Sequence, residues 1–182
     1  MRIIGGSHKG RVIKTPRDLP VRPTTDFAKE ALFNILQNRF NLQDCNVLDL
    51  FSGTGHISFE FASRGVKRIV CVDKSSKCLS FIRTTSEVFG FQLSVVRGDV
   101  FDFLKRDTNS YDIIFADPPY DIKNIEDIHR LVYTQKLLNP GAWLIIEHGE
   151  RTSLKHLDQF VEQRRYGGVN FSIFSAASAN AE

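Results

Sequence analysis

The chain has 182 residues, of which 42% are hydrophobic and 25% charged, as in ordinary soluble globular proteins. No apolar run approaches the roughly 20 residues that a membrane span requires, and residues 1–6 lack the apolar core of a signal peptide, so we expect a cytoplasmic protein without membrane association. The three cysteines are odd in number and form no C-x-x-C pair, which argues against a disulfide framework and a structural zinc site.

The net charge of +3 is concentrated at the amino-terminal end of the chain. Residues 1–22 hold six basic residues against Asp18 alone, a net charge of +5, so the remaining 160 residues sum to about −2. This distribution predicts a phosphate-binding appendage on a neutral catalytic body, with a solvated basic tail as the alternative. The candidate nucleic-acid contacts are Arg2, His8, Lys9, Arg11, Lys14 and Arg22.

The amino-terminal segment predicts a hairpin followed by a helix. Residues 1–14 carry two short apolar segments around a glycine-rich middle, which is typical of a β-hairpin with a longer loop. After Pro23, apolar residues recur at helical spacing, which predicts a helix from about Thr25 to Asn38. We interpret the apolar stripe of this helix as a face that docks on the rest of the chain.

From residue 46 onward the pattern becomes one of repeated strand, loop and helix. The predicted strands are 46–50, 68–73, 93–96, 113–116 and 142–147, at intervals that suit βαβ crossovers. Residues 160–174 alternate around a Gly-Gly turn and predict an antiparallel pair. We therefore expect an α/β fold with a mostly parallel, seven-stranded sheet, helices on both faces and a carboxyl-terminal hairpin. The candidate boundary separates an amino-terminal extension (1–41) from the sheet domain (42–182).

Acidic residues recur at one edge of the predicted sheet. Asp49, Asp73, Asp99 and Asp117 stand at or just past the ends of the first four strands, and Gly53 with its neighbours allows close approach of a ligand to the first loop. The carboxyl ends of parallel strands share an edge, so we expect these acids to line a pocket. Acids repel pyrophosphate but tolerate a cationic, phosphate-free nucleoside such as S-adenosyl-L-methionine. Helix caps and turns are the alternative role of each acid taken alone.

The fourth predicted strand stops at Asp117-Pro118-Pro119-Tyr120. Because proline cannot donate to a strand ladder, Pro118 marks the end of the strand. Two consecutive prolines stiffen the backbone, so Asp117 and Tyr120 are presented on a rigid segment. A rigid acid beside an aromatic ring suits a planar substrate, whereas a helix cap and a packed strand-end aromatic are the alternatives.

Three other residues near the predicted edge remain open. We interpret His56, inside the glycine loop, as a tolerated loop residue and not as a catalytic base. Glu147 and His148 end the fifth strand, where they can rim the pocket or act as surface acceptors and caps.

Several segments carry a resemblance to known families. Asp49 to Gly55 resembles the first motif of class I S-adenosyl-L-methionine-dependent methyltransferases, and residues 117–120 resemble the amino-methyltransferase tetrapeptide. More narrowly, the chain resembles the bacterial RsmD family of small-subunit ribosomal RNA guanine-N2 methyltransferases. The segments that carry this second resemblance are Met1 to Gly6, Arg22-Pro23-Thr24, Glu30 to Asn34 and Tyr166-Gly167.

The resemblance implies a Rossmann-like class I methyltransferase fold and transfer of a methyl group from S-adenosyl-L-methionine to the N2 amine of a guanine in 16S ribosomal RNA. It implies S-adenosyl-L-homocysteine as the product, no metal, a small-subunit ribosomal particle as the partner, and a monomer. The implied catalytic residues are Asp117, Pro118, Pro119 and Tyr120. The implied cofactor-binding residues are Thr24, Asp49, Phe51, Gly53, Thr54, Gly55, Asp73, Lys74, Asp99, Val100 and Asp117. Ser58 departs from the family pattern, which has glycine there.

Other functions remain possible on the sequence. The tetrapeptide also suits an acceptor such as adenine N6 in DNA or RNA, or a protein glutamine. A nucleic-acid-binding module that keeps the fold without turnover is a different class, and the intact glycine loop and Asp117 argue against it. An NAD-dependent oxidoreductase is disfavoured because Ser58 replaces the third glycine of the dinucleotide fingerprint.

Overall fold

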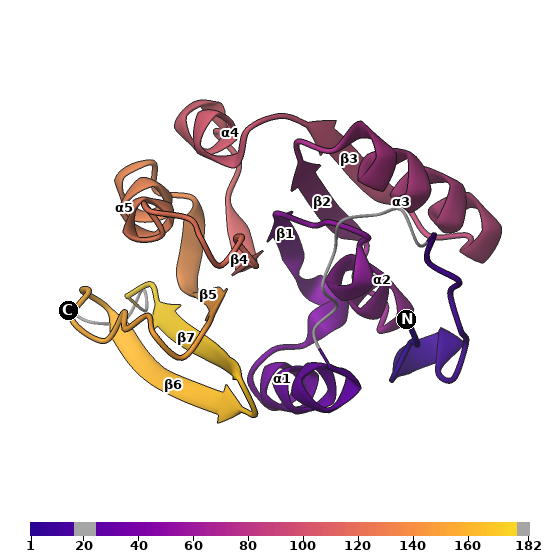
Figure 1. Cartoon of the computed structure of the whole chain (residues 1–182), viewed down its shortest axis with the longest axis horizontal. Coiled ribbons are helices and arrows are strands. Elements are labelled where there is room, and N and C mark those ends of the chain that lie inside the picture. Colours follow the sequence, from indigo (N-terminus) through magenta and orange to yellow (C-terminus); the bar gives the residue numbers. More distant parts are fainter. Residues whose placement is uncertain (17–24, 178–182) are drawn as a thin grey trace.

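The computed structural model describes residues 1–16 and 25–177, in which a seven-stranded sheet is flanked by helices (Figure 1). The strands are β1 (Asn46–Leu50), β2 (Arg68–Asp73), β3 (Leu93–Arg97), β4 (Tyr111–Ala116), β5 (Leu138–His148), β6 (Phe160–Tyr166) and β7 (Val169–Ser175). The helices are α1 (Asp26–Arg39), α2 (His56–Ser63), α3 (Ser76–Phe89), α4 (Val100–Arg106) and α5 (Glu126–Thr134), with short 3-10 helices η1 (Gly6–His8) and η2 (Leu42–Asp44). Over the described residues, no helix combines the length and apolarity needed to cross a membrane.

The predicted fold class is confirmed. The strands lie in the order β3-β2-β1-β4-β5-β7-β6, and only the pairings that involve β7 are antiparallel among the described strands. The fifth strand is longer than predicted, because Leu138 already pairs with Tyr111 of β4. Helix α1 begins one residue after the predicted start, because the Thr25 hydroxyl caps it by accepting from the Ala28 N–H at 3.2 Å. The division at residue 41 stays a prediction.

Strand β1 lies where the chain reverses its progress across the sheet. From β1 the chain continues to β2 and β3 on one side, and it then returns to β4 on the other side of β1. In open α/β sheets, ligands bind outside the carboxyl ends of the strands at such a point. The connections after β1 and β4 are therefore the parts of the fold that should position a site.

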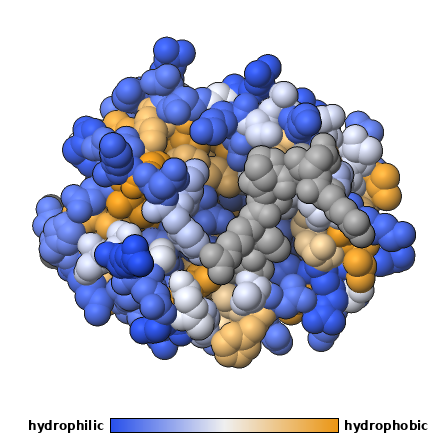
Figure 2. Space-filling view, in the orientation of Figure 1, coloured by the Kyte–Doolittle hydropathy of each residue, from blue (hydrophilic) through white to orange (hydrophobic). Residues whose placement is uncertain are grey.

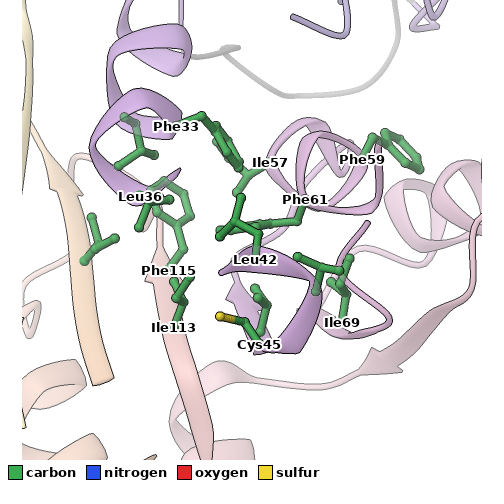
Figure 3. Packing of buried hydrophobic residues seen from close by; sticks show 14 of the residues in the cluster. Phe33, Leu36, Leu42, Cys45, Ile57, Phe59, Phe61, Ile69, Ile113 and Phe115 are labelled. Carbon is green, nitrogen blue, oxygen red and sulfur yellow. The ribbon is translucent and has the colours of Figure 1, made fainter. Parts of the chain in front are cut away.

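Different helices cover the two faces of the sheet. Helices α1, α2 and α3 share one core cluster with the face that carries Val47 and Ile113, and Phe33 and Phe61 meet there edge to face (Figure 3). Helices α4 and α5 share the other cluster with the next residues along the strands, such as Leu48. Because successive strand residues are buried on opposite faces, the central strands read as continuous apolar runs.

The amino-terminal segment forms the predicted hairpin, and it is docked on α2. Its two arms are joined by backbone hydrogen bonds, including Ile3 N–H to Arg11 O at 2.9 Å. Gly6 has φ +75°, and a Cβ at this position would lie 1.9 Å from the Ser63 carbonyl oxygen. Only glycine allows this approach, so the glycine-rich middle of the hairpin serves as a contact with the body of the protein.

A buried ionic network fastens this hairpin to α1 and α2. The fully buried Glu60 carboxylate accepts from the Ile4 and Gly5 N–H groups at 2.9 and 2.8 Å. The same carboxylate pairs with Lys29 of α1 at 3.5 Å and with Arg64 at 2.8 Å. Burial lowers the pKa of Lys29 from its ordinary value, and the charge of Glu60 opposes that effect. The network therefore joins three separate segments of the chain through one carboxylate.

Candidate active site

A cavity of about 600 Å³ opens at the carboxyl edge of the sheet. Its wall consists of the loops that follow β1, β2, β3 and β4, together with the end of β5. Apolar side chains such as Phe51, Phe101 and Ile122 line it beside several carboxylates. The volume of this cavity is that of a typical small-molecule site. The face of the molecule seen in Figure 2 is largely hydrophilic, with hydrophobic patches between the hydrophilic side chains.

The loop after β1 reaches the cavity through three of its predicted residues. Phe51, Gly53 and Thr54 line the wall, and Phe51 adopts the left-handed region with φ +58°. Gly55 is not part of the wall, and it precedes α2 with φ +76°. A Cβ at Gly55 would lie 2.8 Å from the side chain of Ile82 in α3, so this glycine lets the loop pack closely on α3.

The ends of β2 and β3 contribute two acids that differ in role. Both oxygens of Asp73 accept backbone hydrogen bonds, from Gly53 N–H at 2.8 Å and from Ser75 N–H at 2.7 Å. Asp73 thereby fixes the glycine loop against the end of β2. The exposed Asp99 caps α4 through one oxygen, Oδ1, which accepts from Phe101 and Asp102 N–H groups.

The predicted residues next to these acids, Lys74 and Val100, also line the cavity. Val100 is buried, and Lys74 is exposed at the rim. Asp99 itself both caps α4, which was its alternative role, and lines the cavity, as predicted.

Asp49 lies beneath the wall. It is only 2% exposed, and it accepts a hydrogen bond from the Ser58 hydroxyl at 2.5 Å. Burial raises the pKa of Asp49 to about 7, with the negative charge of Asp73 adding to the effect and the Ser58 hydrogen bond opposing it. Ser58 thus provides a hydrogen-bond donor to Asp49 from α2.

The Asp117-Pro118-Pro119-Tyr120 segment follows β4 and lines the cavity with all four residues. Pro118 is buried, whereas Tyr120 is 52% exposed. The Asp117 N–H donates to Leu50 O at 3.3 Å, so the segment starts beside the glycine loop. Burial raises the pKa of Asp117 well above its ordinary value, and the negative charges of Glu147 and Asp49 add to this effect.

Two buried residues that the sequence did not assign to the site also line the cavity, one of which, Glu147, was a candidate for its rim. Glu147 is 3% exposed at the end of β5, and His56 is 9% exposed at the start of α2. Burial lowers the pKa of His56 to about 3, so its imidazole is neutral at physiological pH. The position of Glu147 at a strand end was the available sequence signal, but its closeness to Asp117 depends on β4 and β5 being neighbours.

The basic residues of the hairpin differ in their surroundings. Lys9, Arg11 and Lys14 are exposed, and among the described residues they form no salt bridge. Arg2 is exposed and pairs with Asp26 at 3.1 Å. His8 is half-buried and packs edge-on against Phe91, with ring centroids 4.7 Å apart. The predicted residues Arg22 and Thr24 lie outside the described residues.

The cavity suits a small organic cation. Buried or half-buried carboxyls gather at and beneath its wall, and a positive charge would offset the burial and the repulsion by neighbouring carboxylates that together raise the pKa of Asp117. The apolar side chains beside them suit a flat ring such as adenine. Within residues 1–16 and 25–177, no group of three or more His, Cys, Asp or Glu side chains is placed to hold a metal ion.

The strand order is that of the class I methyltransferase fold, and the cavity lies at the edge of the sheet where ligands bind in such folds. The Thermus thermophilus 16S rRNA N2 methyltransferase RsmC, solved with AdoMet and guanosine, shares this fold with a TM-score of 0.68 and 18% identity over 87% of this chain and 45% of that chain. The family model described as Conserved hypothetical protein 95 matches residues 1–175. The chain belongs to this family, the RsmD family of methyltransferases.

Two further relatives match over most of their length. The Haemophilus influenzae protein named Ribosomal RNA small subunit methyltransferase D is 33% identical over 156 residues, which cover 81% of this chain and 78% of that protein. A hypothetical protein of Thermus thermophilus superposes with a TM-score of 0.83 and 25% identity, over 96% of this chain and 98% of that chain. The family model, which matches residues 1–175, also covers the amino-terminal hairpin.

Proposed function

We propose that this protein transfers a methyl group from S-adenosyl-L-methionine to the exocyclic N2 amine of a guanine in 16S ribosomal RNA. The observation that carries the proposal is the rigid Asp117 to Tyr120 segment, which stands in a cavity with acidic walls at the end of β4. We infer further that the protein acts in the cytoplasm as a monomer, on RNA within a small-subunit ribosomal particle.

The methyl donor fits the residues that line the cavity. When bound, S-adenosyl-L-methionine supplies an electrophilic methyl group on a positively charged sulfur and leaves as neutral S-adenosyl-L-homocysteine. Asp99 and Asp73 would hold the ribose, since an acid after the second strand suits a ribose diol. Asp49, beneath the loop, would stabilise the positively charged sulfonium and amino groups of the methyl donor. Phe51 and Phe101 would hold its adenine ring.

The acceptor needs orientation more than activation by a strong base. The exocyclic amine of guanine is a poor nucleophile because its lone pair is delocalised into the ring. Asp117 and the Pro118 carbonyl would accept the two amine hydrogens, which favours a pyramidal nitrogen with its lone pair directed at the methyl group. The nitrogen then loses one proton, to Asp117 or to water. Tyr120 would stack on a base flipped into the site, with about 1–3 kcal/mol from stacking.

The RNA substrate is supported by relatives and by charge. The Haemophilus influenzae relative carries the name of a small-subunit ribosomal RNA methyltransferase, and the RsmC structure contains guanosine. In this chain, Lys9, Arg11 and Lys14 form an exposed basic group on the hairpin, which suits contact with phosphates.

The test is transfer of labelled methyl groups from S-adenosyl-L-methionine to small-subunit particles that lack the modification, with the product nucleotide mapped by mass spectrometry. N2-methylguanine at one position in 16S RNA is the expected product. N6-methyladenine, methylated glutamine or the absence of transfer despite cofactor binding would each contradict the proposal. Naked 16S RNA and assembled particles, compared side by side, identify the form of the substrate.

Neutralising the hairpin should weaken RNA binding without affecting the methyl donor. In Lys9→Gln with Arg11→Gln, we expect the slope of log affinity against log salt concentration to decrease by up to about 1 per residue, because each lost cation removes a phosphate contact. Calorimetry should find unchanged S-adenosyl-L-methionine affinity, since neither residue lines the cavity. Lys105→Gln, on α4, is the control. Unchanged RNA affinity in the double variant would mean that Lys9 and Arg11 contact solvent and not RNA.

Affinity for S-adenosyl-L-methionine should rise as the pH rises through the range near 7 in which Asp49 ionises. Burial raises the pKa of Asp49 to about 7 in the ligand-free protein, and that of Asp117 is raised as well. A cationic ligand favours the ionised forms, so binding releases protons wherever these acids are protonated. The affinity should therefore fall below pH 7, by at most about tenfold per pH unit for each proton released.

Calorimetry in buffers of different ionisation enthalpy measures the affinity and the proton release together. Asp49→Asn should flatten the dependence because it removes one of the titrating groups. An affinity that does not vary with pH in the unsubstituted protein would contradict the acidic character assigned to the cavity.

A further inference from the structure

Asp117 directly follows the last residue of β4, and Glu147 lies near the end of the neighbouring strand β5. The β4–β5 register pairs Phe115 with Ile145 and Ala116 with Ile146, so continuing it by one residue past the end of β4 brings Asp117 beside Glu147. Paired positions on neighbouring strands lie about 4.7–4.9 Å apart. Since side chains alternate between faces and Phe115 and Ile145 belong to the same core cluster, Asp117 and Glu147 also share that face.

Both side chains are directed at the cavity. Glu147 and Asp117 line it, and Glu147 is only 3% exposed. Burial is the largest cause of the raised pKa of Asp117, and the negative charge of the nearby Glu147 is the second. Next to Glu147, the buried His148 is held by Ser172 through a 2.8 Å hydrogen bond, which fixes the end of β5. Two adjacent acceptors on fixed strand ends therefore face one ligand site.

We propose that Glu147 selects guanine by accepting a hydrogen bond from its N1–H while Asp117 accepts from the neighbouring N2 amine. Guanine presents these two donors side by side on its Watson–Crick edge. Adenine presents an amine beside an unprotonated N1, whose lone pair a carboxylate repels. A carboxylate has about four lone-pair positions, so Glu147 can accept from the base and keep a protein partner.

This inference rests on the proposed function, and it assigns a residue to the choice of base. The amine that reacts is common to guanine and 2-aminopurine, but N1 carries a hydrogen only in guanine. Leaving an N1 lone pair against a buried carboxylate removes a hydrogen bond and adds a repulsion, and buried polar sites discriminate strongly on this basis.

The experiment compares small-subunit particles whose RNA carries guanine or 2-aminopurine at the mapped position. For each protein, kcat/KM for methyl transfer is measured on both. We expect the unsubstituted protein to prefer guanine, and Glu147→Gln to reduce this preference by about tenfold or more, because a glutamine amide can donate to an unprotonated N1. Glu87→Gln, an exposed acid on α3 outside the cavity, should keep the full preference.

The outcomes are separable. Equal use of both bases by the unsubstituted protein, or an unchanged preference in Glu147→Gln, would overturn the role of Glu147 while leaving guanine methylation intact. Absence of N2-methylguanine with the unsubstituted protein would instead overturn the proposed function. Where Glu147→Gln turns over too slowly on both substrates, competition binding gives the ratio of the affinities for the two particles, and there too a ratio unchanged from that of the unsubstituted protein contradicts the proposal.

Discussion

Asp117→Ala is expected to lower the rate constant of methyl transfer by about 100- to 1,000-fold. Alanine would remove the acceptor that we propose for the amine of the bound base, so the orientation of the nucleophile would be lost. Asp117→Asn should lie between, because it keeps one acceptor oxygen but places a donor near the amine hydrogens. The measurement is single-turnover transfer of labelled methyl groups to small-subunit particles at saturating S-adenosyl-L-methionine.

The same substitution should not destabilise the fold. Burial and the charge of Glu147 raise the pKa of Asp117, so the folded protein binds that proton more tightly than the unfolded chain does. Such an acid lowers stability as the pH rises from its unfolded pKa, about 4, through its folded pKa. At neutral pH, removing the carboxyl should therefore leave the melting temperature unchanged or higher, as is common for functional residues.

The control for this prediction is Asp102→Asn, an exposed acid on α4 that pairs with Lys105 and does not line the cavity. It should retain full transfer. Near-normal turnover in Asp117→Ala would contradict the catalytic assignment, and a large drop in melting temperature would show that the carboxyl holds the fold together.

The sheet could be predicted because its strands are buried on both faces. Continuous apolar runs, such as that in β4, end at prolines or acids, and their spacing allows only crossover connections. The acids at the ends of these strands were therefore assigned to one edge without knowledge of the strand order. Asp73, Asp99 and Asp117 do line one cavity there, since this result needs only parallel strands.

Features that depend on contacts between distant segments could not be predicted. Asp49 lies under the loop and accepts a hydrogen bond from Ser58, which comes from the next helix. Glu147 joins the cavity because β5 lies beside β4, and a run of apolar residues does not encode strand order. Helical periodicity likewise assigned α1 a docking face, but it gave no sign that Lys29 would be buried with Glu60.

Glu60 provides the clearest case for a stability test. Its side chain is fully buried and compensates two cations, Lys29 and Arg64, whose side chains are 3% and 7% exposed. It also accepts the N–H groups of Ile4 and Gly5, which hold the amino-terminal hairpin against α2. Removing one member of a buried ionic network is more damaging than removing all of it, because the remaining charges stay buried without compensation.

Glu60→Gln should therefore lower the free energy of unfolding by about 3–5 kcal/mol. Denaturant unfolding followed by circular dichroism measures this change, and Glu150→Gln, which breaks a surface pair with Arg165, should have little effect. Lys29→Met added to Glu60→Gln should restore part of the loss, because it removes one of the uncompensated buried cations. A loss below about 1 kcal/mol, or strictly additive losses in the double variant, would mean that the hairpin is held by its apolar contacts and by the glycine approach to Ser63.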